Sequence, residues 1–256
     1  MIDELLQDYR QISLADMSAV RLMNRIDTKF LSTVPVLTQL LELLHEEYFV
    51  QDTDGLRLFP YRTLYFDTAA HRMYMMHQSG KKTRQKIRMR TYVNSDMHFL
   101  EIKNKNNRGR TKKKRIAIDA ITDDTSPFED FIGRQSDYHS SELTPHLENS
   151  FRRITLVNNN FTERLTIDTG LRFCNRLNGT VCALPALTVI ELKRDGTSES
   201  PALKYFNRLR IKSSGFSKYC MGMVFTSPDL KANRFKERRR YVEKLQQKAT
   251  ILTTNQ

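Results

Sequence analysis

Alternation of apolar and basic side chains constrains the fold of this chain more than any other feature of its sequence. In KIRMR, Lys86, Arg88 and Arg90 occupy alternate positions, and Ile87 and Met89 lie between them. Side chains of a β-strand point in turn to opposite faces of the sheet. The segment therefore predicts a strand with one apolar face and one face made of cations.

The same alternation recurs in other predicted strands. Between Lys81 and Arg115 the sequence contains 14 basic residues and two acids, Asp96 and Glu101. Exposed strand faces are commonly polar, so a solvated basic sheet is the simpler interpretation of any single strand. Like charges on neighbouring strands repel each other, however, and repetition over many strands favours a ligand that compensates them. The cations predicted to share this face are Lys29, Lys86, Arg88, Arg90, Lys103, Lys113, Arg115, Arg164, Arg172 and Lys193.

A closed antiparallel barrel would satisfy all of these strands together. Helices would cover its apolar exterior, and its interior would be wet and cationic. Arginine offers forked hydrogen bonds and lysine a point charge, and both suit phosphate oxygens. Of the glutamates on the charged face, Glu101 is expected to pair with a neighbouring cation. Glu191 could pair with Lys193 or hold a divalent metal, and periodicity alone does not decide between these roles.

The composition also indicates a polyanionic partner. The 256 residues carry a formal net charge of +13, and the pI is about 9.7. Candidates are phosphorylated small molecules, polyphosphate, nucleic acid and an anionic membrane. The three cysteines form no CxxC pair, which is typical of a reducing cytoplasm. The N-terminal residues include early acids, and no segment approaches the roughly 18 apolar residues of a membrane span, so we expect neither a signal peptide nor a spanning helix.

The order of the predicted elements indicates an α+β fold, because antiparallel strands carry helices at their margins. We expect one domain, 1–228, with its core at about 20–225, followed by a basic C-terminal helix and tail at 229–256. The polar stretch 120–157 is expected to hold only short helices, around 126–133 and 145–153. The strands are expected at 25–32, 61–68, 84–93, 98–105, 112–119, 162–169, 171–175 and 187–194, and the other helices at 12–23, 35–48, 69–78, 200–211, 216–225 and 229–247.

Seven segments occur in the order and at about the spacing of a known family: RIDTKF, YFDT, KIRMRTY, FLEIKNK with GRTKKKR, RLTIDTGLRF, VIELK and FSKYCMG. Over roughly residues 20–225 the chain resembles the catalytic domain of the vacuolar transporter chaperone (VTC) polyphosphate polymerases, of the triphosphate tunnel metalloenzyme superfamily. It resembles the short bacterial type, without the fused phosphate-sensing and membrane-spanning domains of the fungal proteins. The resemblance implies an eight-stranded antiparallel β tunnel barrel with a basic lumen, flanked by helices.

The resemblance also implies which residues form the site. Glu191 matches the metal-binding glutamate, for Mn²⁺ or Mg²⁺, and Lys218 matches the lysine of the closing helix. Arg88 and Arg90 match paired phosphate-binding arginines, and with Lys218 they are the expected catalytic residues. The other phosphate-binding residues carried over from the family are Lys29, Lys103, Lys113, Arg115, Arg164, Arg172 and Lys193.

The activity that the resemblance implies is that of a polyphosphate polymerase. Such an ATP:polyphosphate phosphotransferase moves the γ-phosphate of ATP to a growing polyphosphate chain, with phosphate or pyrophosphate as primer. The first strand departs from the ExExK pattern of the superfamily, because Arg25 stands at the first acid. This departure fits a polymerase better than a triphosphatase, although Asp27 keeps hydrolysis of triphosphate or polyphosphate open. A non-catalytic polyphosphate-binding module is a third alternative.

The basic C-terminal run KANRFKERRRYVEKLQQK leads to two further expectations. No nucleic-acid-binding motif accompanies it, so nucleic acid is not expected as the main partner. The helix could dock on a membrane-protein partner, which would bring a cytoplasmic protein to the membrane periphery. No GxxxxGK[ST] loop is present, so side chains, and not a backbone cradle, would hold the phosphates.

Overall fold

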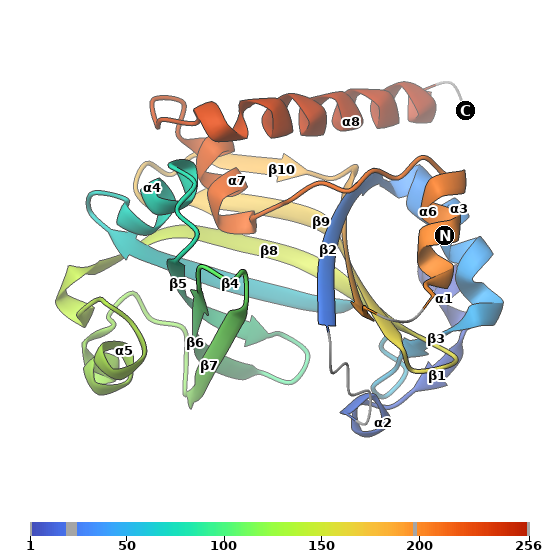
Figure 1. Ribbon diagram of the computed structural model, residues 1–256, viewed down its shortest axis with the longest axis horizontal. Helices are drawn as coiled ribbons and strands as arrows, with labels where there is room; N and C mark the ends of the chain where they lie inside the picture. The colour runs from blue at the N-terminus through green and yellow to red at the C-terminus, as the bar shows by residue number, and fades with distance from the viewer. Residues whose placement is uncertain (1, 19–24, 197–198, 255–256) are drawn as a thin grey trace.

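One curved sheet organises the protein (Figure 1). The computed structural model describes residues 2–18, 25–196 and 199–254. Eight strands follow one another across the sheet, and each pairs antiparallel with its neighbours. In spatial order they are β2 (Arg25–Thr33), β11 (Leu187–Asp195), β9 (Glu163–Asn175), β8 (Leu143–Asn158), β4 (Phe59–Thr68), β5 (Arg84–Tyr92), β6 (Met97–Lys105) and β7 (Thr111–Ile118). The predicted α+β class and eight-stranded tunnel architecture are confirmed.

Shorter elements extend the sheet and surround it. β1 (Arg10–Ile12) pairs in parallel with β3 (Tyr48–Gln51), β3 pairs with β8, and β10 (Val181–Leu184) pairs with β9. The helices are α1 (Ile2–Gln7), α2 (Leu14–Ser18), α3 (Val34–Leu44), α4 (Arg72–Gln78), α5 (Glu129–Gln135), α6 (Pro201–Arg208), α7 (Lys218–Thr226) and α8 (Lys236–Thr254), with 3₁₀ turns η1 (His45–Glu47), η2 (Ser126–Phe128), η3 (Ser140–Glu142) and η4 (Asn233–Phe235).

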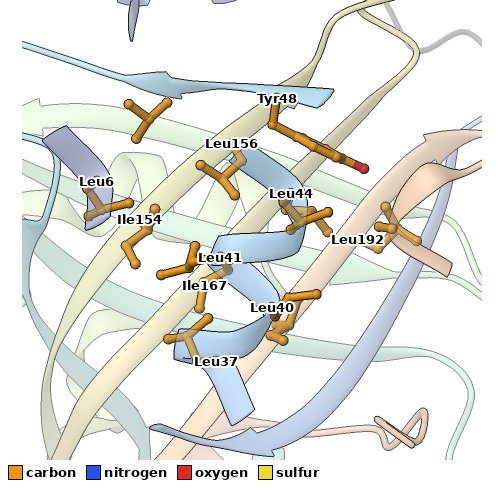
Figure 2. Packing of buried hydrophobic residues seen from close by; sticks show 14 of the residues in the cluster. Leu6, Leu37, Leu40, Leu41, Leu44, Tyr48, Ile154, Leu156, Ile167 and Leu192 are labelled. Carbon is orange, nitrogen blue, oxygen red and sulfur yellow. The ribbon is translucent and has the colours of Figure 1, made fainter. Parts of the chain in front are cut away.

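The outer face of the sheet is apolar, and α3 covers part of it (Figure 2). Pro35 lies in the first turn of α3, where its missing N–H breaks no helical hydrogen bond. Four leucines recur along one side of the helix, the spacing that gives a helix one apolar face. They pack on side chains of β8, β9 and β11; the residues in contact are Leu37, Leu40, Leu41, Leu44, Ile154, Leu156, Ile167 and Leu192.

The inner face of the sheet is the one opposite these clusters. On β5 and β6, Ile87, Met89 and Leu100 point outward into a buried cluster that includes Ile132 of α5. Because successive side chains alternate, the charged residues between them point inward. Glu101, for example, is opposite Arg88 in the register of these strands. The predicted separation of apolar and charged faces on these strands is confirmed.

Helix α7 packs against the inner face (Figure 1). Its buried residues lie against Leu147 of β8 and Phe173 of β9. Gly222 permits this approach, because a Cβ added there would lie 2.3 Å from Leu147 Cδ2 and 2.7 Å from Phe173 Cδ1. The chain before α7 follows the edge of β2, where the backbone N–H of Ser214 donates to the carbonyl oxygen of Lys29 at 2.8 Å. These contacts place the first turn of α7 over the charged residues.

Helix α8 packs on the same side as α7. Phe235 and Val242 are buried in the cluster that contains α7, and the backbone N–H of Ala186 donates to Gln246 Oε1 at 3.0 Å. Within the described ranges, every helix is too short or too polar to cross a membrane. The three cysteines are free thiols. The division of the chain at residue 228 stays a prediction.

The short helix predicted around 145–153 was wrong. These residues belong to β8, which has 16 residues and lies at the centre of the sheet. Pro145 is accommodated in this strand because it lies beside a register shift between Tyr65 and Phe66, where regular pairing is already broken. The helix predicted around 126–133 is present as η2 and α5.

Two boundaries also differ from the predictions. The expected strands 162–169 and 171–175 form one strand, β9, which continues through Gly170 with φ +61°. Of the helix expected at 12–23, α2 spans Leu14–Ser18, and residues 19–24 lie outside the described residues.

The contact at Gly222 gives a test of this packing. We expect Gly222→Ala to lower the free energy of unfolding by about 1–3 kcal/mol, because the added methyl group overpacks a core that has no room for it. Chemical denaturation measures the change. Gly133→Ala in α5 is the matched control, since the Cβ there would be 3.7 Å from the flexible Glu129 side chain, and it should be neutral or stabilising. Equal destabilisation by both variants would contradict the packing described.

Candidate functional site

A buried glutamate organises the inner face of β5, β6 and β7. Glu101 is fully buried, and its Oε2 accepts a hydrogen bond of 2.7 Å from Arg88 Nε. Its Oε1 accepts one of 3.0 Å from Lys113 Nζ on β7. Burial opposes ionisation of Glu101, but the charges of Arg88, Arg90 and Lys113 outweigh it and hold the pKa of this carboxyl well below its usual range. The carboxylate therefore fixes cations from two neighbouring strands.

A buried aspartate has the corresponding role between β8, β9 and α7. Arg153 donates from Nε and Nη2 to the two oxygens of Asp168, at 2.6 and 2.8 Å. Lys218, the first residue of α7, donates to the same carboxylate and lies over the ring of Phe151, 4.3 Å from its centroid. Burial raises the pKa of Asp168, but Arg153 and Lys218 outweigh it, so its pKa is well below the usual range. Asp168 thus connects α7 to the sheet.

A third carboxylate lies on β11. Glu191 Oε2 is 3.0 Å from Lys29 Nζ of β2, and its Oε1 is 2.8 Å from Lys193 Nζ. Burial again opposes ionisation, and the two lysines outweigh it and lower the pKa of Glu191. Glu101, Asp168 and Glu191 therefore each bind two cations.

Three further inward cations have no such partner. Among the described residues, Lys86, Arg90 and Lys103 form no ion pair with a carboxylate. Lys86 donates to Ser217 Oγ at 2.8 Å, and Arg90 Nε donates to Thr63 Oγ1 at 3.2 Å. Burial lowers the pKa of Lys86; burial and then Arg88 lower the pKa of Arg90 to about 10. Repulsion from Arg88, followed by burial, lowers the pKa of Lys103 well below its usual range.

These charges act on one another across the curved sheet. Lys29 of β2 repels Lys86 of β5, and Glu191 of β11 attracts Lys103 of β6. Since these strands are remote from one another in the order of the sheet, its curvature brings them face to face. Tyr65 reports the resulting potential: burial raises the pKa of its phenol, yet the surrounding cations, Arg88 first, lower it below its usual value. The inner face is strongly electropositive and suits a polyanion.

The acids of the inner face give only a partial metal site. No group of three or more His, Cys, Asp and Glu side chains in the described ranges could hold a metal ion. Both oxygens of Glu191 contact lysines, and Asp27 lies close enough to influence Lys193. Mg²⁺ is usually bound by one or two carboxylates together with phosphate oxygens. Glu191 and Asp27 therefore fit a divalent metal when phosphate oxygens complete its coordination.

The structure brings most of the predicted site residues together. Lys29, Arg88, Arg90, Lys103, Lys113, Glu191, Lys193 and Lys218 lie on or over the inner face, as the preceding contacts show. Arg164 occupies an inward position opposite Lys193, and Arg115 is an exposed inward residue opposite Glu101 whose guanidinium lies 4.4 Å from the centroid of the Phe99 ring. Their roles in phosphate binding and metal binding stay predictions.

The placement predicted for Arg172 was wrong. Its side chain is exposed, on the face opposite Leu171 and Phe173, which pack with α7. A register shift between β8 and β9 lets Gly170 and Leu171 occupy the space opposite Phe151. An extra residue in one strand reverses which later side chains point inward. Arg172 therefore points away from the other cations.

Sequence reasoning missed Arg153, whose side chain is only 17% exposed and is paired with Asp168. It was missed because β8 was expected to be helical. The alternating positions Leu147, Asn149, Phe151 and Arg153 were the available signal, since they share one face of a strand. The two cationic partners of Asp168 were likewise not predicted.

A family model and several solved structures are similar to the chain. The chain matches the VTC domain over residues 24–226. No curated protein matches it. A putative adenylyl cyclase from Hippeastrum, described as having a dominant triphosphatase activity, is similar in structure with a TM-score of 0.48 and 17% identity, over 79% of this chain and 96% of that one. Putative adenylate cyclases from Bacillus halodurans (0.45, 16%, 76% and 96%) and Vibrio parahaemolyticus (0.45, 11%, 80% and 99%) are also similar.

The aspartate that connects α7 to the sheet can be tested by substitution. We expect Asp168→Asn to lower the free energy of unfolding by about 3 kcal/mol, because two enclosed cations lose their shared carboxylate. Added tripolyphosphate should restore part of this loss by supplying negative charge. Asp123→Asn is the control, because its pair with Arg176 is largely exposed and should contribute less than about 1 kcal/mol. Thermal unfolding measures the stability of both variants. Equal stability would contradict the role of Asp168 in connecting α7 to the sheet.

Proposed function

Because the chain belongs to the VTC-domain family, we propose that it is a polyphosphate polymerase that transfers the γ-phosphoryl group of ATP to inorganic polyphosphate. The observation that carries this proposal is the set of inward cations without carboxylate partners, Lys86, Arg90 and Lys103, beside others held in place by Glu101, Asp168 and Glu191. The unpaired cations supply charge for a phosphate chain. The paired ones are already oriented, so little reorganisation accompanies binding.

The inner face would act mainly through position and charge. Cations of β5 and β6 would bind the triphosphate of ATP, and a terminal oxygen of the acceptor would attack the γ-phosphorus in line. A new P–O bond forms to the acceptor, and the bond from the γ-phosphorus to the β–γ bridging oxygen breaks, so ADP leaves with that electron pair. The acceptor is the growing chain, or phosphate or pyrophosphate as primer. Arg88, Arg90 and Lys218 would stabilise the charge that develops on the transferred group.

A divalent metal, Mn²⁺ or Mg²⁺, would be held by Glu191 and would neutralise phosphate charge when bound. Glu191 would exchange lysine contacts for it, and Lys29 and Lys193 would then be free to bind phosphate oxygens. Glu191 would thus hold the two lysines in place in the free protein and hold the metal once phosphate is bound.

Hydrolysis is a second candidate, with water as the acceptor in the same site. Asp27 favours it, because an acid on the first strand is the feature by which hydrolytic relatives are expected to hold metal, and this one lies close enough to Lys193 to influence it. Arg25, two residues before Asp27 in the sequence, stands where the superfamily pattern has an acid, and this favours polymerisation. Long chains formed together with ADP would distinguish polymerisation from release of phosphate alone.

The partners of the site are proposed to be ATP, inorganic polyphosphate and a short phosphate primer, in the cytoplasm. The basic face of α8 is proposed to dock on a membrane-protein partner. The proposed substrates, location and membrane partner all follow from the proposed polymerase activity, and the fold alone does not imply them.

An activity assay tests the proposal directly. We expect Lys103→Met to reduce polyphosphate synthesis from ATP, Mn²⁺ or Mg²⁺ and a trace of pyrophosphate by about 100-fold, because a cation of β6 that binds and positions the triphosphate of ATP is lost. The variant leaves no carboxylate without a partner, so the fold should be retained. Products are resolved on a polyphosphate gel. Arg172→Met is the matched control and should keep activity within about twofold, since its side chain points away from the site.

Three results would change the conclusion. Phosphate release without chains would replace the polymerase with a hydrolase. Chain synthesis unaffected by Lys103→Met would remove the inner face from the mechanism. A large loss in Arg172→Met would contradict the outward position of that residue.

The pH dependence of binding gives a separate test. Burial, offset in part by Asp168, lowers the pKa of Lys218 to about 8. Lys218 is therefore charged below about pH 8 and loses its charge above it, and a polyanion favours the charged form. Affinity for tripolyphosphate should fall as pH rises from 7 to 9, with proton uptake on binding, measured by calorimetry in two buffers. Lys218→Arg stays charged and should abolish this fall; identical pH profiles of the two proteins would exclude Lys218 as a ligand-binding cation.

A further inference from the structure

A second group of cations lies where α4, β5, α7 and α8 meet (Figure 1). It consists of Arg84 and Lys86 of β5, Arg234 of η4 and Arg238 in the first turn of α8. We refer to these four residues as the β5–α8 cluster. Lys86 also belongs to the inner face, so the two groups of cations are continuous.

His77 of α4 locates the four cations around a common centre. Its Nδ1 lies 3.0 Å from Cys220 Sγ, and its ring packs edge-on against Phe235, with centroids 5.4 Å apart. Burial, and then the charges of the four cations, lower the pKa of His77 to about 2, so the ring is neutral. Cys220 is fully buried, which raises its pKa and keeps the thiol protonated. Neither central group supplies negative charge.

Two glycines make room for the arginines. At Gly80, with φ +78°, an added Cβ would lie 2.6 Å from Arg234 Nη1. At Gly215 it would lie 3.4 Å from Arg238 Nη2. Each guanidinium group therefore lies close to the backbone of a glycine, with Arg238 half-buried and Arg234 exposed.

The positive charge of the cluster is uncompensated. In the described part of the chain, none of its four residues forms an ion pair with an acid. The Nε of Arg238 is buried and has no hydrogen-bond partner among the described residues. Like charges held together around a buried donor are costly without an anion. The arrangement therefore suits a ligand with several negatively charged oxygens.

The cluster extends the line of cations along β5. Arg84, Lys86, Arg88 and Arg90 occupy alternate positions of the strand and so share one face. Neighbours in this series are about 7 Å apart along the strand, from a rise of about 3.3 Å per residue. A linear polyanion bound to Arg88 and Arg90 could therefore continue past Lys86 to Arg84 and to the arginines at the start of α8.

We propose that the β5–α8 cluster binds phosphate groups of a polyphosphate chain where the chain leaves the inner face. The chain as the source of these groups rests on the proposed function; free orthophosphate offers the same chemistry. Arg234 and Arg238 lie beyond residues 24–226, the part of the chain that matches the VTC domain, so the site is additional to that match.

The test compares ligands of different length at constant pH and over a series of ionic strengths. Binding of long-chain polyphosphate, tripolyphosphate and orthophosphate is measured by calorimetry without ATP. Arg234→Glu should weaken long-chain binding about tenfold, reduce its salt dependence, and change tripolyphosphate binding by less than about twofold. Arg240→Glu, an exposed change of the same charge on α8, is the control and should leave both affinities unchanged. The Tm of each variant establishes that it is folded.

The outcomes distinguish polyphosphate from free orthophosphate as the ligand, and they distinguish failure of this binding site from failure of the proposed polymerase activity. Weaker orthophosphate binding with unchanged long-chain binding would support the same site with a free anion as its ligand. No change in any ligand for Arg234→Glu, or equal losses in Arg240→Glu, would overturn the site. If the wild-type protein bound long chains in this way but made none from ATP, the polymerase proposal would fail and the binding site would stand.

Discussion

Carboxylates buried among cations are the interaction on which the rest of the site depends. Glu101, Asp168 and Glu191 each hold two cations, and the partners come from different strands or from α7. An isolated buried cation would lose its charge or turn to solvent, and a shared carboxylate prevents both. The same pairs join β2 to β11, β6 to β7, and α7 to β9. The contacts are Glu101 with Arg88 and Lys113, Asp168 with Arg153 and Lys218, and Glu191 with Lys29 and Lys193.

This arrangement leaves the inner face with more cations than its acids can neutralise. Lys86, Arg90 and Lys103 lie beside paired residues and raise the local positive potential, which Tyr65 reports through its lowered pKa. A phosphate ligand would therefore replace repulsion with attraction at the unpaired positions and find the paired positions already oriented. Repulsion among these cations destabilises the fold, and packing of the apolar clusters on the outer face of the sheet offsets it.

The apolar and charged faces of the sheet could be predicted from alternation in the sequence, because side chains alternate without interruption along β2, β5, β6 and β11. The prediction failed where a strand departs from regular alternation. Gly170 inserts an extra residue into β9 and turns Arg172 outward. An isolated glycine within a strand often marks such a bulge, but alternation of side chains alone does not show it. Arg153 was missed for a different reason: β8 has polar residues on both faces and a proline near its start, so its strand character depends on its central place in the sheet.

The edges of the sheet have a consequence for how a polymer could reach the inner face. Within the described residues, β2 and β7 end the strand order and do not pair with each other, and the free edge of β2 bonds instead to residues 212–214. The seam between these two strands therefore has no continuous backbone ladder. Opening it would break no backbone hydrogen bonds between β2 and β7, so a polymer could enter the inner face from the side as well as by its end.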